Sequence, residues 1–368
     1  MHHMFRSVAA FAATVAVAGC AGALQGAPVA PSAKLYVVNQ GGASITVIDQ
    51  RALAVDTVLD LKTMGFTGNA KPHHVVVEND GSFWYVSLIG DGRVVKLDRN
   101  NRVVGQVKME TPGLLALDPV RDSLYVGRSM TAVNPPKSLA VIRRSDFTLV
   151  DEQEILVSRP HALLVTRDGK WVHTASLAEN RIASINVGTG QVTLTTIPGA
   201  PRSLVQFAQS RDGQTMVVGG ELSNSVLFFD LGKGAPLVTT REVPLAGKPW
   251  DPMFSSDGRT AYITQFGENT VTAMDAATGK VLRTYSGNLA QPYDIIVSAD
   301  GRHLFVVNQN TGATKAGQSA HDNMPGMAGH DMKATDGWLS VIDIASGKTV
   351  KTLMLGTSPS GAGAAGAR

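Results

Sequence analysis

The chain has 368 residues, of which 43% are hydrophobic and 17% are charged, so its composition excludes a disordered protein. Its formal net charge of +3 is too small to predict, from charge alone, binding to nucleic acid or to an acidic membrane surface. The chain has only one cysteine, which excludes a framework of internal disulfides.

The N-terminal residues form a predicted export signal. A short region with Arg6 precedes an uncharged apolar run, Val8 to Val17, which is shorter than the roughly 20 residues that a membrane-spanning helix needs. The segment closes with the letters VAGC, ending at Cys20, which resemble the lipobox of bacterial lipoproteins. The resemblance implies a signal peptide at 1–19, cleavage before Cys20 and lipidation of that cysteine. An ordinary secretory signal with a small residue near its cleavage site is the alternative.

The residue after the cysteine bears on where such an anchor would reside. Ala21, and not an aspartate, follows Cys20, and by the habit of lipoproteins this implies the outer membrane. Residues 20–32 are rich in alanine, glycine and proline and predict a flexible tether. We therefore expect a lipid-anchored protein on the periplasmic side of the cell envelope, with the anchor as its contact with the membrane.

A repeated phrase organises residues 33–363. It consists of a proline, a short apolar strand, an Asp-Gly turn and a second apolar strand. In four copies the aspartate and the glycine fall eight and nine residues after the proline. These copies begin at Pro72, Pro160, Pro249 and Pro292. Degenerate copies begin at Pro112, where Ser123 replaces the turn glycine, and at Pro201, where Asp212-Gly213 comes three residues late.

The spacing of the prolines predicts an all-β, seven-bladed β-propeller. Most gaps between them are 40 to 48 residues, the length of a four-stranded blade. The last gap of 67 residues, up to Pro359, contains an insertion at 311–337. Because Pro359 has no strand pattern after it and the first unit has none before it, we expect the C-terminal strand to become the inner strand of the N-terminal blade. Residues 364–368 are then a tail.

The segments LYVVNQGGASITVID, LFVVNQNTG and VIDIASGKTVKTL resemble the YVTN repeat of bacterial and archaeal envelope propellers. The resemblance spans nearly all of residues 34–361 and implies the fold, but propellers host many unrelated activities. A more distant similarity is to the propeller domains of nitrous oxide reductase and cytochrome cd1 nitrite reductase. Neither chemistry transfers, because the chain lacks a Cys-x-x-Cys-His haem motif and has too few channel histidines for the copper cluster of nitrous oxide reductase.

The residues after each proline predict a first candidate site. The first strand of each propeller blade lines the central channel, so these residues are expected to meet at one mouth of it. Imidazole and carboxylate groups there would suit Cu, Zn, Ni or Fe. Adjacent residues of a strand face opposite sides, so at most one of two tandem histidines is expected to face the channel. The alternative is that the groups are satisfied by water and by one another. The candidate ligands are His73, His74, His161, Asp251 and Asp294.

Three further residues at the same predicted mouth are candidates for contact with a ligand: Arg202, Trp250 and Tyr293. They could stack on a small molecule or on the bases of single-stranded nucleic acid, as in some YVTN-type propellers. The low net charge disfavours a nucleic-acid partner.

The insertion predicts a second candidate site, for copper. Its segment HDNMPGMAGHDMK is rich in methionine and histidine, whose thioether and imidazole groups suit Cu(I) and both copper oxidation states respectively. Glycine and aspartate neighbours disfavour methionines that merely fill a core. The spacing resembles the Met/His-rich segments of periplasmic copper-handling proteins, although a disordered insertion without a ligand is the alternative. The candidate ligands are His321, Met324, Met327, His330 and Met332.

The leading functional hypothesis is a monomeric, non-catalytic, lipid-anchored binding module, linked to copper and meeting an envelope protein or a small ligand. The alternative is a metal-dependent enzyme, a lactonase-like hydrolase or an oxidoreductase, with its site at the channel mouth. No nucleophile motif, phosphate loop or dinucleotide fingerprint favours a particular reaction. Aspartates that end the third strand phrases are expected to cap turns. They are Asp49, Asp98, Asp230, Asp275 and Asp343.

Overall fold

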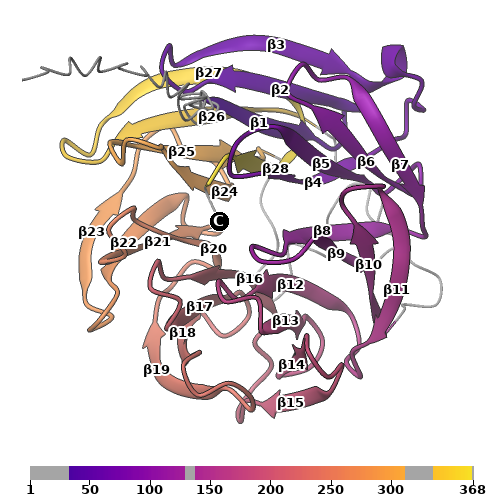
Figure 1. Cartoon of the computed structure of the whole chain (residues 1–368). Coiled ribbons are helices and arrows are strands. Elements are labelled where there is room, and N and C mark those ends of the chain that lie inside the picture. Colours follow the sequence, from indigo (N-terminus) through magenta and orange to yellow (C-terminus); the bar gives the residue numbers. More distant parts are fainter. Residues whose placement is uncertain (1–32, 129–136, 311–334, 367–368) are drawn as a thin grey trace, which may run out of the picture. The chain divides into compact units, whose positions relative to one another are not determined.

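A computed structural model describes residues 33–128, 137–310 and 335–366. The described residues fall in one compact unit and form twenty-eight strands and a single 3-10 turn, η1 (Leu61–Met64). The strands make seven four-stranded antiparallel sheets arranged as blades of a ring (Figure 1). The predicted seven-bladed β-propeller is therefore confirmed. Among the described residues, no helix has the length and apolar character that crossing a membrane requires.

Each blade has an inner, a second, a third and an outer strand. In order from blade 1 to blade 7, the inner strands are β28 (Pro359–Ala364), β4 (Pro72–Val77), β8 (Pro112–Leu117), β12 (Pro160–Val165), β16 (Leu204–Gln209), β20 (Pro249–Phe254) and β24 (Pro292–Val297). The second strands are β1 (Lys34–Asn39), β5 (Phe83–Leu88), β9 (Ser123–Arg128), β13 (Trp171–Ser176), β17 (Thr215–Gly220), β21 (Thr260–Gln265) and β25 (His303–Asn308). The third strands are β2 (Ser44–Asp49), β6 (Arg93–Asp98), β10 (Ser138–Arg143), β14 (Arg181–Asn186), β18 (Ser225–Asp230), β22 (Thr270–Asp275) and β26 (Asp336–Asp343). The outer strands are β3 (Ala54–Asp60), β7 (Val103–Lys108), β11 (Thr148–Glu154), β15 (Val192–Thr196), β19 (Val238–Pro244), β23 (Val281–Tyr285) and β27 (Thr349–Thr357).

The ring closes through blade 1, which combines the two ends of the described chain. The C-terminal strand β28 pairs antiparallel with β1, with Leu35 opposite Ala364 and Val37 opposite Ala362. Strand β28 also lies against both neighbouring inner strands, β4 and β24. This confirms the predicted closure, because β28 completes blade 1 as a four-stranded sheet like the other six.

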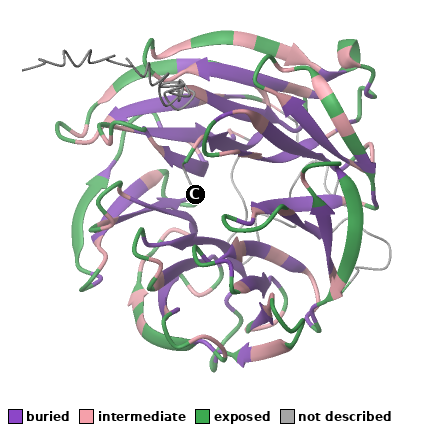
Figure 2. Ribbon diagram, in the orientation of Figure 1, coloured by how far each residue is buried: buried purple, intermediate pink, exposed green. Residues whose placement is uncertain are grey.

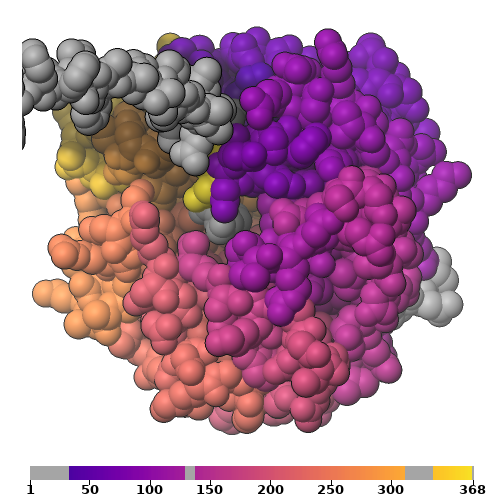
Figure 3. Space-filling view, viewed as in Figure 1, coloured from indigo at the N-terminus to yellow at the C-terminus, as the bar shows by residue number. Residues whose placement is uncertain are grey.

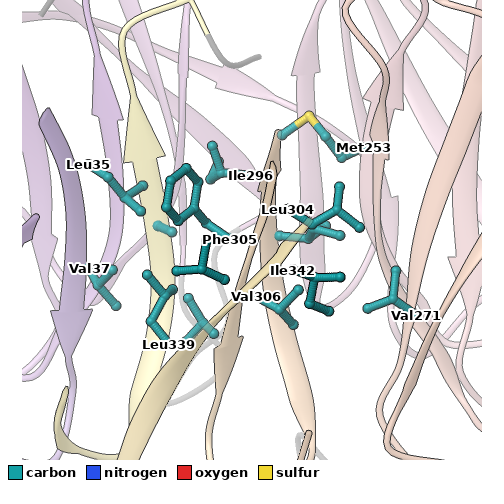
Figure 4. Packing of buried hydrophobic residues seen from close by; sticks show 14 of the residues in the cluster. Leu35, Val37, Met253, Val271, Ile296, Leu304, Phe305, Val306, Leu339 and Ile342 are labelled. Atoms are coloured by element: carbon teal, nitrogen blue, oxygen red, sulfur yellow. The ribbon is translucent and has the colours of Figure 1, made fainter. Parts of the chain in front are cut away.

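Burial falls from the inner strands to the outer ones (Figure 2). In blade 6 all six residues of β20 are buried, whereas four of the five residues of β23 are exposed. The core therefore lies between neighbouring blades. In one cluster Leu35 of blade 1 packs with Phe305 of blade 7, and the same cluster continues to Met253 of blade 6 (Figure 4). Apolar burial between sheets, at roughly 25 cal/mol per Å², is the main force that holds the blades together.

The Asp-Gly turns join inner and second strands by local hydrogen bonds. In blade 6 the carboxylate of Asp257 accepts from Ser255 Oγ at 2.6 Å and from Arg259 N at 3.0 Å. Gly258 adopts a left-handed φ of 74°, which glycine allows without strain. The aspartates that end the third strands cap the next turn as predicted. Each of them accepts at least one backbone N–H: Asp49, Asp98, Asp230, Asp275 and Asp343.

Blade 5 corrects the predicted register. Its inner strand begins at Leu204, and Leu204 pairs with Gly220 as Pro249 pairs with Gln265 in blade 6. Counted from Leu204, the Asp212-Gly213 turn falls at the usual eight and nine residues. The turn is therefore not late: Leu204, and not Pro201, starts the repeat in this blade.

Candidate functional site at the channel mouth

Blades 1 to 7 follow one another around the ring (Figure 3), and at one end of their inner strands lies a small cavity. We call it the mouth cavity, and its volume is about 10 Å³, the space that a single water molecule needs. All its lining residues stand one or two places after the first residue of an inner strand, here the first and second mouth positions. They are His73, His74, Leu114, His161, Val205, Gln206, Trp250, Asp251, Tyr293, Asp294 and Ser360.

Both tandem histidines line this cavity, contrary to the expectation that at most one would. The reason is a break in strand register: the pairing of β4 with β5 shifts between Pro72 and His74. A bulge of this kind disrupts the alternation of side chains, so consecutive residues can reach the same region. Equivalent shifts occur at the start of the inner strands in the other blades, for example between Pro249 and Pro252.

Polar side chains at the second mouth position bond to the next blade. Asp251 Oδ2 accepts from Ile295 N at 3.0 Å, and Asp294 Oδ2 accepts from Ala362 N at 3.0 Å. His74 Nδ1 accepts from the equivalent amide of blade 3, Leu115 N, at 3.2 Å. In each case the donor is the third residue after the start of the neighbouring inner strand. These buried groups therefore join adjacent blades.

Two side chains at the first mouth position form a similar contact. The Nδ1–H of His161 donates to the carbonyl of Val205 at 2.7 Å, and Ser360 Oγ donates to the carbonyl of His73 at 3.3 Å. His73 Nδ1 lies 3.2 Å from Gln40 Oε1. The rings of His73 and His161 lie 6.3 Å apart across blade 3, where Gly113 has no side chain to separate them.

The side of the mouth formed by blades 4 to 7 is aromatic. Trp250 lies 5.0 Å from the ring of Phe266 and 5.0 Å from that of Tyr293, and Leu177 and Val205 complete this buried cluster. Burial raises the pKa of the Tyr293 phenol well above its usual 10.0, and the nearby carboxylates Asp294, Glu221 and Asp251 raise it further. Tyr293 is therefore neutral at physiological pH, and Trp250 and Tyr293 are largely packed against protein.

Arg202 does not join the mouth cavity, because the register of blade 5 differs from the predicted one by three residues. Its guanidinium forms an ion pair with Glu242 of the outer strand β19, and it donates to the carbonyl of Pro198 at 3.0 Å. Val205 and Gln206 occupy the two mouth positions in its place. The constant spacing to Asp212-Gly213 was the signal that could have identified them.

The residue before every inner strand has a strained backbone. All seven adopt a left-handed φ of 39° to 57°, although none is a glycine, and such strain commonly marks functional sites. In blade 6 this conformation directs the carbonyl of Lys248 to the amide of Phe266, just beyond the second strand, at 3.1 Å. The seven residues are Lys71, Thr111, Arg159, Ser203, Lys248, Gln291 and Ser358.

The described residues contain no group of three or more His, Cys, Asp or Glu side chains placed to hold a metal. The predicted transition-metal set of His73, His74, His161, Asp251 and Asp294 is thus brought to one cavity but not into such a group. The copper candidates His321, Met324, Met327, His330 and Met332 lie outside the described residues, as does Cys20.

No protein-family profile matches the chain. A curated relative, an uncharacterized WD repeat-containing protein from Synechocystis sp., is 26% identical over 140 residues, which are 38% of this chain and 38% of the relative. The chain thus matches about two fifths of that relative's length.

Solved structures of similar fold cover more of the chain. A periplasmic gluconolactonase from Pseudomonas aeruginosa is 20% identical with a TM-score of 0.67, covering 89% of this chain and 98% of the lactonase. The dihydro-heme d1 dehydrogenase NirN is 16% identical with a TM-score of 0.60, covering 91% of this chain and 76% of the dehydrogenase. Identities this low support the propeller fold alone.

Proposed function

We propose that this chain is a non-catalytic binding propeller, held by a lipid on Cys20 at the periplasmic side of the envelope. The observation that supports a non-catalytic role is that polar residues of the mouth are used to hydrogen-bond neighbouring blades together. Asp251, Asp294, His74 and His161 each bond to a neighbouring blade. The cavity between them, at about 10 Å³, is far smaller than the several hundred Å³ of a typical site for an organic ligand. Because the cavity is this small, we expect a partner to bind to the face of the ring.

A lactonase-like hydrolase is the competing function, favoured by the likeness in fold to the gluconolactonase. The test is hydrolysis of glucono-δ-lactone by the purified chain, with His161→Asn as the matched variant. The asparagine amide can still donate to the carbonyl of Val205, but it lacks the second ring nitrogen of His161. We expect hydrolysis at the rate of buffer alone. Hydrolysis above that rate that His161→Asn abolishes would overturn the non-catalytic proposal.

We also propose that the insertion binds Cu(I) through its methionines and histidines, a proposal that rests on their number and spacing in the sequence. Strands β25 and β26 pair without interruption from His303 opposite Asp343 to Asn308 opposite Trp338, so blade 7 can form without the insertion. Deleting 318–333 should therefore abolish Cu(I) capture from a chromophoric chelator and leave the melting temperature nearly unchanged. Retained capture would refute the copper site, and a large fall in the melting temperature would make the insertion structural.

The proposed anchor has a direct test. In cells, the full chain should fractionate with membranes, and the Cys20→Ser variant should not, because the thiol that accepts the lipid is absent. A Cys20→Ser chain that remains with the membrane fraction through high-salt washing would contradict the anchor.

A further inference from the structure

Three consecutive blades place side-chain oxygens at the same position around the mouth cavity. Blades 5, 6 and 7 carry Gln206, Asp251 and Asp294 at the second mouth position, and all three line the cavity. Their exposed fractions are 7%, 2% and 3% respectively, so these oxygens are removed from bulk water. The other four blades have His74, Leu114, Ala162 and Gly361 there, so the oxygens are gathered on one side.

The two carboxylates belong to adjacent blades and both line the cavity. Asp251 Oδ2 lies 3.0 Å from Ile295 N, and Ile295 directly follows Asp294 on β24. The carboxylate of blade 6 therefore lies against the strand that carries the carboxylate of blade 7. Both carboxylates also raise the pKa of the Tyr293 phenol, after the larger effect of burial. The cavity wall is thus electronegative on this side.

Gln206 differs from the two aspartates because its Oε1 atom is buried and accepts no hydrogen bond from any residue that the structure describes. The sequence of the next blade explains this. Asp251 and Asp294 accept from the third residue after the start of the neighbouring inner strand. The residue equivalent to that donor for Gln206 is Pro252, which has no N–H. A buried amide oxygen without a partner is unfavourable, so the partner of Oε1 is expected in the cavity.

We propose that the mouth cavity binds one hard cation through Gln206 Oε1 and the carboxylates of Asp251 and Asp294. Oxygen donors of this kind, an amide carbonyl and carboxylates, are those that calcium-like cations prefer, whereas copper favours imidazole and thioether. The volume of about 10 Å³ accommodates one ion or one water molecule. This site shares Asp251 and Asp294 with the set expected from the sequence, but Gln206 takes the place of the histidines and the metal belongs to a different class. It is independent of the copper proposal.

Terbium luminescence can test this site, because Tb³⁺ substitutes for Ca²⁺ and is excited through nearby aromatic rings. Trp250 and Tyr293 line the same cavity. The full chain, stripped with a chelator, should give saturable sensitised emission that Ca²⁺ displaces. Asp294→Asn should weaken Tb³⁺ affinity on the order of tenfold, because ligand charge sets the affinity of such sites. The asparagine oxygen can still accept from Ala362 N, so the blade-to-blade bond is kept.

Gln206→Leu is the second variant, and it should weaken Tb³⁺ affinity by roughly threefold or more, because it removes one ligand of the site. Asp257→Asn, at an exposed turn carboxylate, is the control and should leave the affinity unchanged. Calcium should also raise the melting temperature of the wild type more than that of Asp294→Asn, since a ligand stabilises the state that binds it. The proposal is overturned by absent emission, which would assign the cavity to water, or by an affinity that neither mouth variant alters. If Gln206→Leu does not fold, Asp294→Asn decides.

Discussion

Two aspartates six residues apart in blade 6 differ in the contacts that they make. Asp257 is exposed and accepts hydrogen bonds from Ser255 and Arg259, its neighbours in one turn. Asp251 is buried and accepts from Ile295, which is 44 residues further along the chain in the next blade. One type of side chain, an aspartate, thus stabilises a single repeat at the turn end and joins two repeats at the mouth end.

This difference has an energetic consequence. A hydrogen bond within a turn contributes to the local conformation of one blade, and water can replace it when it is lost. At the mouth the N–H of Ile295 is buried against the carboxylate of Asp251, so loss of that carboxylate leaves a buried donor unsatisfied. Mutations of the mouth aspartates should therefore lower the free energy of unfolding more than mutations of the turn aspartates do.

The largest effect is expected for Asp251→Ala. Removing the carboxylate leaves Ile295 N without its acceptor and opens a buried polar gap, which should lower the free energy of unfolding by about 3 kcal/mol. Asp251→Asn keeps a side-chain acceptor for this N–H, so it should lower the free energy of unfolding by clearly less. Urea denaturation followed by tryptophan fluorescence measures both. Equal losses for the two variants would show that the hydrogen bond to blade 7 is not what Asp251 provides.

A smaller effect is expected when Pro252 is replaced. Pro252→Ala supplies the N–H that Gln206 Oε1 lacks, so the two positions should become coupled. In a double-mutant cycle, the change in the free energy of unfolding caused by Pro252→Ala should be about 1 kcal/mol more stabilising in the wild-type background than in the Gln206→Leu background. The cycle cancels the change in unfolded-state entropy that any proline replacement causes. A coupling of zero would mean that Gln206 does not face this amide.

At the turn end, Asp257→Ala should lower the free energy of unfolding by only about 0.5–1 kcal/mol, because the turn hydrogen bonds are exposed and local. The same urea denaturation measures this loss beside that of Asp251→Ala. A loss at Asp257 as large as that at Asp251 would remove the distinction between the two ends of the repeat.

The turn aspartates also predict an acid limit. Hydrogen bonds from Ser210, Ser255 and Ser298 hold the pKa values of Asp212, Asp257 and Asp300 below the ordinary 3.8. Because these folded pKa values are lower than the unfolded ones, their contribution is fully present above about pH 4 and is lost as the pH falls through the folded values. Melting temperatures measured downward from pH 5 should fall below pH 4. Replacing the three serines by alanine should make that fall shallower, and an unchanged slope would contradict this account.

The fold was predictable because it depends on local pattern. The Asp-Gly spacing after Pro72, Pro160, Pro249 and Pro292 identified the repeat. The closing strand was identified because no further repeat follows Pro359 in the sequence. The mouth was predictable only in part. Asp251 and Asp294 were placed there correctly, but their acceptor roles depend on amides 44 and 68 residues away, which no local pattern encodes.

Gln206 was missed for a related reason. The repeat of blade 5 was predicted to start at Pro201 because the other repeats start at a proline, although the spacing to the turn indicated Leu204. Arg202 was therefore assigned the position that Val205 occupies. The bulge that brings both His73 and His74 to the cavity is likewise a property of pairing between strands, and the sequence of a single strand does not reveal it.

The most direct test of the account is a high-resolution crystal structure of the chain grown with calcium. We expect density in the mouth cavity at about 2.3–2.6 Å from Gln206 Oε1 and from oxygens of Asp251 and Asp294, the distances typical of calcium. Density at about 2.7–3.2 Å from the same atoms would be a hydrogen-bonded water and would contradict the cation site. A direct hydrogen bond between Gln206 and protein, with no density in the cavity, would contradict it as well.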